Sequence, residues 1–341
     1  MDAHVLVYGA YGHTGRFVVP ELLERGLTPV LSGRDPARLA AMAARFPGLD
    51  VRPAAADDPR SLASAVRGTA IVVNCAGPFL DTAVPVAAAA VAAGAHYLDV
   101  TAEQAAVREL YRTHQERGWP ASIAVIPAMA FYGGLADLLA TTAAAGWAAI
   151  DEITVAIGLD RWWPTAGTRN TGRRNTATRL VVSGGRLVPA PSPAPLRDWE
   201  FPPPLGRQAV AGSPFTEIVT MARHLPAAAI VTYLTSAALD DLRDPATPAP
   251  AAADQAGRSA QQFIVDVTLR RGGQERRISA AGRDIYAVTA PLVAEAAARL
   301  ADGRASVRGA AAPGEAFDAG DFLAALSPCH LTIRNGALVP E

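Results

Sequence analysis

The chain has 341 residues, of which 50% are apolar and 18% are charged, and its formal net charge is −1. This length fits two domains better than one compact core, and the composition excludes a disordered chain. The near-neutral charge gives no electrostatic basis for binding nucleic acid or an anionic membrane surface. All 31 basic residues are arginine, so Schiff-base catalysis by a lysine and a P-loop are both excluded.

No targeting or metal-binding pattern stands out in the sequence. The first four residues lack the basic start and apolar run of a signal peptide. The longest nearly uncharged stretch, residues 82–95, is too short to span a bilayer, and two cysteines cannot build a disulfide framework. The six histidines show no spacing typical of a metal site. We therefore expect a cytoplasmic protein with no membrane span and no metal.

Short apolar runs alternate with helical patterns through residues 1–127. Strands are predicted at residues 4–8, 28–32, 49–52, 70–75, 96–100 and 122–127, and helices at residues 14–25, 36–46, 59–67, 82–93 and 102–117. This alternation is typical of a Rossmann domain, a doubly wound parallel sheet with helices on both faces. Its ligand crevice is expected at the carboxyl ends of the strands.

The pattern changes after residue 127. Residues 134–145 are predicted to be helical, residues 152–158, 217–220 and 230–235 to be strands, and residues 263–270 and 275–280 to form a hairpin. Residues 189–204 and 244–261 are rich in proline or alanine and are predicted to be loops. We expect a second α+β domain with a mixed sheet over residues 128–284. Helices at 288–300 and 319–326 are expected to return to the Rossmann domain, so that residues from about 285 to 341 belong to it.

The segment between the first strand and the first helix has the glycine spacing of a dinucleotide-binding loop. The helix N-terminus offers unpaired N–H groups and a positive partial charge to a pyrophosphate. Gly12 would let the backbone approach the phosphates, and Gly15 would let the helix pack closely. Ala10 stands where the usual motif has its first glycine, and a packing turn is the alternative interpretation. The residues predicted to contact the cofactor here are Gly9, Tyr11, Gly12, His13, Thr14 and Gly15.

The end of the second strand indicates which dinucleotide binds. An NAD site usually has an acidic residue here, which accepts a hydrogen bond from the ribose. Ser32 and Arg34 occupy this region instead, and an arginine suits the 2′-phosphate of NADP(H). Asp35 precedes Pro36 and is interpreted as a helix N-cap. The predicted cofactor is therefore NADP(H).

Two further turns follow strands of the first domain. Ala76, Gly77 and Pro78 come after the fourth strand and are predicted to contact the nicotinamide ribose, unless they form a turn without a ligand. Thr101 follows the fifth strand and is also predicted to contact the cofactor. Glu103 lies either at the crevice or on the solvated first turn of the next helix.

Two side chains are candidates for catalysis. Tyr132 follows the sixth strand, where the domains should meet, and could donate a proton to a reduced substrate. An interface tyrosine without catalytic function is the alternative. His224 is the second candidate donor, with a structural pair as its alternative. The arginine-rich residues 161–179 could bind an anionic or aromatic substrate, or form a solvated helix face.

Several of these segments resemble the saccharopine dehydrogenase-like superfamily, and in particular its branch of trans-acting enoyl reductases. The resemblance implies a Rossmann domain, an α+β domain inserted after the sixth strand, and C-terminal helices that return to the first domain. The chain departs from many relatives in having Tyr132 where they have an aspartate, and in lacking the lysine that lysine-pathway members use. The resembling segments are residues 9–15, 32–34, 74–79, 96–103, 167–168, 217–225 and 313–317.

The sequence thus predicts an NADPH-dependent oxidoreductase that reduces a polarised C=C or C=N bond of a secondary metabolite or carrier-bound substrate. The alternatives are a saccharopine dehydrogenase-type enzyme acting on the C–N bond of an amino acid, and a catalytically silent NADP(H)-binding partner protein. The expected partners are a small-molecule or carrier-bound substrate and a possible second copy of the chain.

Overall fold

The computed structural model describes residues 3–306 and 309–336. Its first sheet is entirely parallel and has the strand order β15-β6-β5-β4-β1-β2-β3. The order reverses beside β1, which lies between β2 and β4, and this is the switch point where such sheets bind ligands. The strands are β1 (His4–Tyr8), β2 (Thr28–Gly33), β3 (Val51–Pro53), β4 (Ile71–Asn74), β5 (His96–Asp99), β6 (Ala124–Ile126) and β15 (Gly309–Ala310).

Helices cover both faces of this sheet. Side chains of α1, α2 and α10 pack on one face, and those of α3, α4 and α5 pack on the other. The predicted N-cap is confirmed, because the Asp35 carboxylate accepts hydrogen bonds from the N–H groups of Ala37 and Arg38. The doubly wound α/β fold is therefore confirmed. The helices are α1 (Gly15–Glu24), α2 (Pro36–Ala43), α3 (Pro59–Ala65), α4 (Phe79–Ala92), α5 (Gln104–Arg117) and α10 (Thr289–Ala301).

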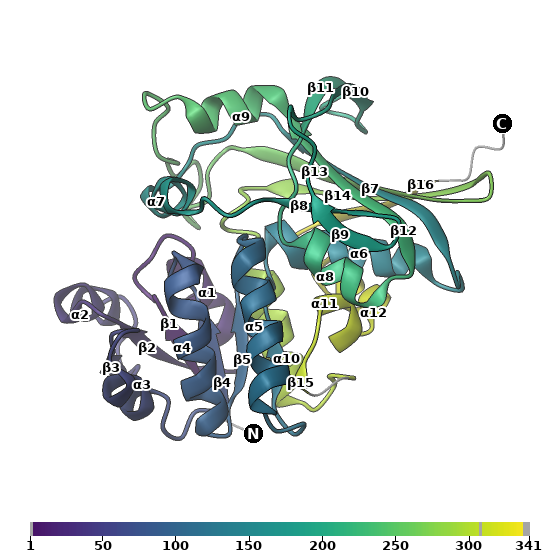
Figure 1. The fold of residues 1–341 in the computed structure, drawn as a ribbon. Coiled ribbons are helices and arrows are strands. Elements are labelled where there is room, and N and C mark those ends of the chain that lie inside the picture. The colour runs from purple at the N-terminus through teal and green to yellow at the C-terminus, as the bar shows by residue number, and fades with distance from the viewer. Residues whose placement is uncertain (1–2, 307–308, 337–341) are drawn as a thin grey trace.

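The second sheet is mixed, as predicted, and lies above the first (Figure 1). Its main path has the order β10-β11-β12-β7-β13-β14-β16, and only the β12–β7 pair is parallel. The strands are β7 (Ile150–Leu159), β8 (Leu180–Ser183), β9 (Arg186–Pro189), β10 (Leu196–Glu200), β11 (Arg207–Gly212), β12 (Ala227–Thr235), β13 (Gln262–Arg271), β14 (Gln274–Arg283) and β16 (Thr332–Gly336). The remaining elements are η1 (Phe131–Leu135), α6 (Ala136–Ala144), α7 (Ala166–Arg174), α8 (Glu217–His224), α9 (Ser236–Arg243), α11 (Pro313–Ala316) and α12 (Ala319–Leu326).

Three predictions for this half of the chain differ from the structure. Residues 217–220, predicted as a strand, begin helix α8; all residues from Glu217 to Met221 are buried, and a short buried run of this kind does not separate a strand from a helix. The predicted loop at residues 189–204 contains strand β10, which pairs with β11. The C-terminal region does not return wholly to the first sheet: β15 pairs with β6 there, but β16 pairs with β14 of the second sheet.

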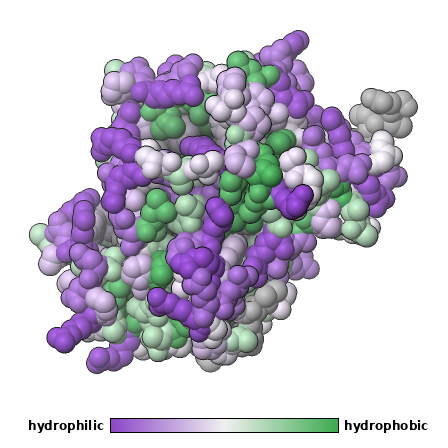
Figure 2. All heavy atoms as spheres, in the orientation of Figure 1, coloured by the Kyte–Doolittle hydropathy of each residue, from purple (hydrophilic) through white to green (hydrophobic). Residues whose placement is uncertain are grey.

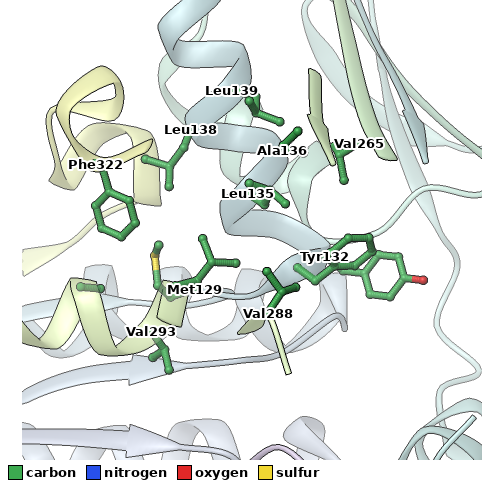
Figure 3. Close-up of a cluster of buried hydrophobic side chains, with 14 of the residues drawn as sticks. Met129, Tyr132, Leu135, Ala136, Leu138, Leu139, Val265, Val288, Val293 and Phe322 are labelled. Atoms are coloured by element: carbon green, nitrogen blue, oxygen red, sulfur yellow. The ribbon is translucent and has the colours of Figure 1, made fainter. Parts of the chain in front are cut away.

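One buried cluster joins the two sheets. It is built where the chain passes from β6 into α6, between the parallel sheet and the second sheet (Figure 3). Met129, Leu138 and Val293 are fully buried in it, and burying a side chain of this size contributes about 1.5–3 kcal/mol. The segment that carries Tyr132 is therefore anchored in the core. Within residues 3–306 and 309–336, none of the helices has the length and apolar character needed to cross a membrane.

Candidate cofactor and substrate site

A cavity of about 1700 Å³ lies at the switch point of the parallel sheet, between it and α7 and α9. Single small-molecule sites typically measure about 300–1,000 Å³, so this cavity has room for a dinucleotide and a second ligand. Hydrophilic side chains predominate on the face shown in Figure 2, with hydrophobic patches between them. The cavity is lined by the β1–α1 loop, the ends of β2 and β4, the η1 segment and α7.

The β1–α1 loop has the conformation of a phosphate-binding turn. The N–H groups of Gly9 and Ala10 donate to the Ser32 carbonyl at 2.8 and 3.1 Å, which fixes the start of the loop. A Cβ on Gly15 would lie 2.3 Å from the Gly9 carbonyl oxygen, so only glycine allows α1 to pack this closely. A Cβ on Gly12 would meet that same oxygen at 3.0 Å, and Gly12 lines the cavity. The loop therefore fits a pyrophosphate, and side chains at positions 12 and 15 would collide with its backbone.

Tyr11, His13 and Thr14 line the cavity together with Gly9 and Gly12, as predicted for the loop. Gly15 is buried behind them. The His13 ring packs edge-on against Tyr286, with ring centroids 5.1 Å apart, and its buried Nε2 has no hydrogen-bond partner in the described part of the chain. Burial, followed by the charge of Arg16, lowers the pKa of His13 to about 4. The imidazole is therefore neutral at physiological pH.

Two exposed arginines line the cavity beyond the end of β2. Arg34 was predicted here, whereas Arg38, in the first turn of α2, was not. The Arg38 guanidinium lies 4.5 Å from the centroid of the Tyr11 ring, and the Tyr11 hydroxyl accepts a hydrogen bond from the Asp35 N–H. Ser32 does not face the cavity, because its buried hydroxyl donates to the Arg52 carbonyl at 2.7 Å.

Replacing Arg34 or Arg38 by alanine is expected to weaken NADPH binding by about 1.5–3 kcal/mol, because each loses a charge-assisted contact with the 2′-phosphate. NADH, which lacks that phosphate, should bind nearly as well as before. Arg45→Ala provides the control, since Arg45 is exposed close to α2 but does not line the cavity. Titration of each variant with both cofactors tests this, and equal losses for NADPH and NADH would contradict it.

The turn after β4 is held rigidly at the cavity wall. Ala76, Gly77 and Pro78, which were predicted to contact the nicotinamide ribose, all line the cavity. The Asn74 side chain accepts a hydrogen bond from the Ala76 N–H at 3.0 Å, and the Thr82 hydroxyl donates to the Ala76 carbonyl at 2.6 Å. These bonds fix the backbone of the turn where the nicotinamide ribose is expected.

Glu103 lines the cavity, which agrees with the crevice alternative and not with the solvated one, and it also has a structural function. Its carboxylate is 1% exposed and accepts a hydrogen bond from the Phe79 N–H at 2.7 Å, so it caps the N-terminus of α4. Burial raises the pKa of Glu103, although the backbone N–H groups of Phe79 and Leu80 oppose this. Thr101 is fully buried and its hydroxyl accepts from the Glu103 N–H. The structure therefore places the Thr101 side chain in the interior, away from the predicted cofactor contact.

Tyr132 lies at the cavity wall with its hydroxyl free. Its ring stacks on Phe215 at 4.2 Å and lies 5.6 Å from Trp162, and Figure 3 shows it directed away from the aliphatic core. The backbone is fixed by Gly133, whose φ of +113° and contact with Thr216 exclude a side chain. The Tyr132 hydroxyl is buried and has no hydrogen-bond partner among the described residues. Burial raises its pKa well above the ordinary value, so this phenol is a hydrogen-bond donor at neutral pH.

The opposite wall carries the arginine-rich segment. Arg173 and Arg174 on α7, and Arg179 after it, line the cavity. Arg174 pairs with Asp81 of α4, with Nη2 3.0 Å from Oδ1, and so joins α7 to the Rossmann domain across the cavity. The Arg179 guanidinium lies 5.1 Å from the centroid of the Phe215 ring. Arg179 therefore lies beside the aromatic ring on which Tyr132 stacks, and the buried Glu217 carboxylate interacts with both Tyr132 and Arg179.

His224 does not belong to this cavity, so its predicted function as proton donor is not supported. Its Nε2 lies 2.8 Å from Oδ1 of Asp137, a fully buried carboxylate of α6. The structural pair is thus the better interpretation. Within residues 3–306 and 309–336, no group of three or more His, Cys, Asp or Glu side chains could hold a metal ion.

We expect His224→Ala to destabilise the protein by roughly 3 kcal/mol under acidic conditions, because it leaves the Asp137 carboxylate buried without its partner. Burial lowers the pKa of His224, but Asp137 raises it by more, so the folded pKa lies above the ordinary value. The ion pair therefore stabilises fully below about pH 6.5 and is lost as pH rises through the folded pKa. Unfolding curves across pH test this. A cost that stays constant from acidic to alkaline pH would contradict it, and NADPH affinity should not change.

The fold and the loop are those of a dinucleotide-binding protein, and comparisons with known proteins show what the N-terminal part resembles. Residues 5–123 match the saccharopine dehydrogenase NADP-binding domain family. A probable mitochondrial saccharopine dehydrogenase-like oxidoreductase of Arabidopsis thaliana is 30% identical over 142 residues, which are 37% of this chain and 31% of that protein. A lipid droplet localized protein of Caenorhabditis elegans is 32% identical over 146 residues, or 39% of this chain and 34% of that protein. The chain thus spans about a third of the length of these curated relatives.

Among solved structures, the apo saccharopine dehydrogenase (L-Glu forming) of Saccharomyces cerevisiae superposes with a TM-score of 0.65 at 13% identity. The alignment covers 98% of this chain and 100% of that one. This likeness confirms the predicted two-sheet fold. The family match over residues 5–123 supports the predicted superfamily and NADP(H) as the cofactor of the N-terminal domain.

Proposed function

We propose that this chain is an NADP(H)-dependent oxidoreductase of the saccharopine dehydrogenase type, which transfers hydride at a carbon bonded to nitrogen. The observation that carries the proposal is the free phenol of Tyr132 at the wall of a cavity that begins at the dinucleotide loop. The saccharopine dehydrogenase-like names of the relatives favour this C–N chemistry over reduction of an enoyl group.

The Rossmann half of the cavity would hold the cofactor. The open N-terminus of α1 would bind the pyrophosphate in the space that Gly12 keeps clear, and Arg34 and Arg38 would bind the 2′-phosphate. NADPH supplies a hydride when bound. The rigid turn at Ala76–Pro78 would orient the nicotinamide ribose by its fixed backbone.

Tyr132 would exchange the proton that accompanies hydride transfer. Its raised pKa keeps the hydroxyl protonated, and its ring is fixed by Phe215 and Trp162, so the donor needs little reorganisation. His13 stays neutral and adds no charge beside the cofactor. Arg173 and Arg179 would attract an anionic substrate to this side of the cavity.

Reduction of a C=C bond in a secondary metabolite or carrier-bound substrate remains the second candidate, because the aromatic rings around Tyr132 offer an apolar surface to a conjugated group. A panel with NADPH separates the two candidates. One arm combines 2-oxo acids with amines, which form imines, and the other contains enoyl thioesters. We expect NADPH oxidation in the first arm. Turnover confined to enoyl thioesters would overturn the C–N proposal, and NADPH binding without turnover in either arm would favour a silent binding partner.

A further inference from the structure

The N-terminus of α7 presents unused hydrogen-bond donors to the cavity. Thr165 caps this helix, and its hydroxyl accepts from the Thr168 N–H at 3.0 Å. The next two N–H groups, those of Ala166 and Gly167, have no acceptor within the helix, because the first turn lacks a preceding turn. Both residues are exposed and line the cavity. The first turn of α7 thus offers two backbone donors to a ligand.

Hydroxyl groups behind this turn supply one more donor. The Tyr286 hydroxyl accepts from the Trp162 indole N–H at 3.0 Å and the Thr165 N–H at 3.3 Å, so its two acceptor positions are filled. Its own proton must therefore go to the Thr168 hydroxyl, 2.9 Å away. The Thr165 and Thr168 hydroxyls share a single hydrogen bond of 3.0 Å, which uses one of their two protons. The other proton is left for an acceptor in the cavity.

Among the described residues, Tyr132 adds an unpaired hydroxyl at the wall of this cavity. Its side chain is 9% exposed, and its hydroxyl has no partner in the part of the chain that the structure describes. The Tyr132 ring lies beside Trp162, whose indole N–H contacts the Tyr286 hydroxyl next to Thr165. Leaving a buried hydroxyl unpaired costs about 1–3 kcal/mol. A ligand atom between Tyr132 and the α7 N-terminus would remove this cost.

The charges around this end of the cavity fit an anion. Of the acidic residues that line the cavity, Asp57 lies on the Rossmann side near Arg34, Asp81 is paired with Arg174, and Glu103 caps α4. None of these three carboxylates is hydrogen-bonded to the first turn of α7. Three further acids near this end do not line the cavity: Asp241 and Asp284 accept backbone hydrogen bonds from Trp162 and Tyr286, and Glu217 is buried. Arg173 and Arg179 also line the cavity, and the helix dipole adds positive partial charge at its N-terminus.

We propose that the N-terminus of α7 is a binding site for a carboxylate group of the substrate. The N–H groups of Ala166 and Gly167 and a threonine hydroxyl would bind the carboxylate oxygens, with the Tyr132 hydroxyl beside them. In an amino acid the carboxylate is bonded to the carbon that exchanges the hydride, so a carboxylate held here places that carbon next to Tyr132. The proposal rests on the proposed function in assigning this part of the cavity to the substrate.

The test is calorimetric titration with glutarate, a plain dicarboxylate, in the absence and presence of NADP⁺. Glutaramide serves as the uncharged probe and inorganic phosphate as the alternative anion. The key variant is Ala166→Pro, which removes one donor N–H while favouring the helix, because proline is preferred at the first helical position. Thr165 has an extended backbone, with φ −70° and ψ 163°, which suits a residue before proline. Ala166→Ser keeps the N–H and is the matched control.

Thr165→Val removes the hydroxyl that binds the ligand and also the N-cap of α7. Thr165→Ser keeps both and is therefore its control. We expect glutarate to bind, glutaramide not to bind, and Ala166→Pro and Thr165→Val each to weaken glutarate about tenfold. The two serine variants should bind like the wild type. Absence of glutarate binding, preference for phosphate, or equal affinity of Ala166→Pro and the wild type would overturn the site. The titration without NADP⁺ tests the carboxylate site independently of the cofactor. A protein that binds glutarate but not NADPH would therefore contradict the proposed function and leave the carboxylate site standing.

Discussion

Tyr132→Phe should lower kcat by about 10²–10⁴ and leave NADPH affinity unchanged, because it removes only the phenolic proton donor. The ring remains in place, since the packing against Phe215 and Trp162 involves carbon atoms that phenylalanine retains. The hydroxyl has no partner in the described residues, so its loss breaks no internal hydrogen bond and should not destabilise the fold. Single-turnover kinetics with the best substrate of the panel measure this effect on the chemical step.

The chain offers a matched control for this variant. Tyr111 is also 9% exposed, also has a buried hydroxyl without a partner, and does not line the cavity. Tyr111→Phe should therefore leave kcat unchanged. If Tyr132→Phe retained the wild-type rate of the chemical step, Tyr132 would not be the donor. A bound water would then be the next candidate.

Gly12→Val should abolish measurable NADPH binding while the protein stays folded. A Cβ at this position already meets the Gly9 carbonyl oxygen at 3.0 Å, and the branched side chain would extend into the space that the pyrophosphate must occupy. Losing two charge-assisted hydrogen bonds, at about 1.5–3 kcal/mol each, corresponds to about a hundredfold or more in affinity. Fluorescence titration of NADPH measures the loss.

Gly320→Val is the control for placing valine at a glycine outside the cavity. Gly320 lies in the first turn of α12, where a Cβ meets only Asp318 at 3.7 Å, and it does not line the cavity. This variant should bind NADPH like the wild type. Normal NADPH binding by Gly12→Val would mean that the loop is not the phosphate site.

The Rossmann half could be predicted from the sequence because its signals are local. Strand-helix alternation, the glycines of the first loop and the Asp35-Pro36 cap each depend on residues close together in the chain. Arg38 also lines the cavity but was not predicted as a cofactor contact. Its position at the cavity depends on where helix α2 begins. Helical spacing from the Asp35 cap was the signal that could have identified it.

The second half was harder to predict because tertiary contacts decide its structure. Ile218, Val219 and Thr220 are β-branched and favour a strand, yet the segment is helical, with every residue from Glu217 to Met221 buried by tertiary packing. The surroundings of Tyr132 could not be predicted either, since Trp162 and Phe215 reach it from distant parts of the chain. The free threonine proton at α7 follows only from hydrogen bonds to Tyr286, more than a hundred residues away.

Parallel titration of the protein with NADPH and NADH tests the assignment of this cavity most directly. With Arg34 and Arg38 beside the 2′-phosphate position, we predict saturable NADPH binding at least about tenfold tighter than NADH binding. Raising the salt concentration should narrow this difference, because both guanidinium groups are exposed. Equal affinity for the two cofactors, or no binding of either, would contradict the account.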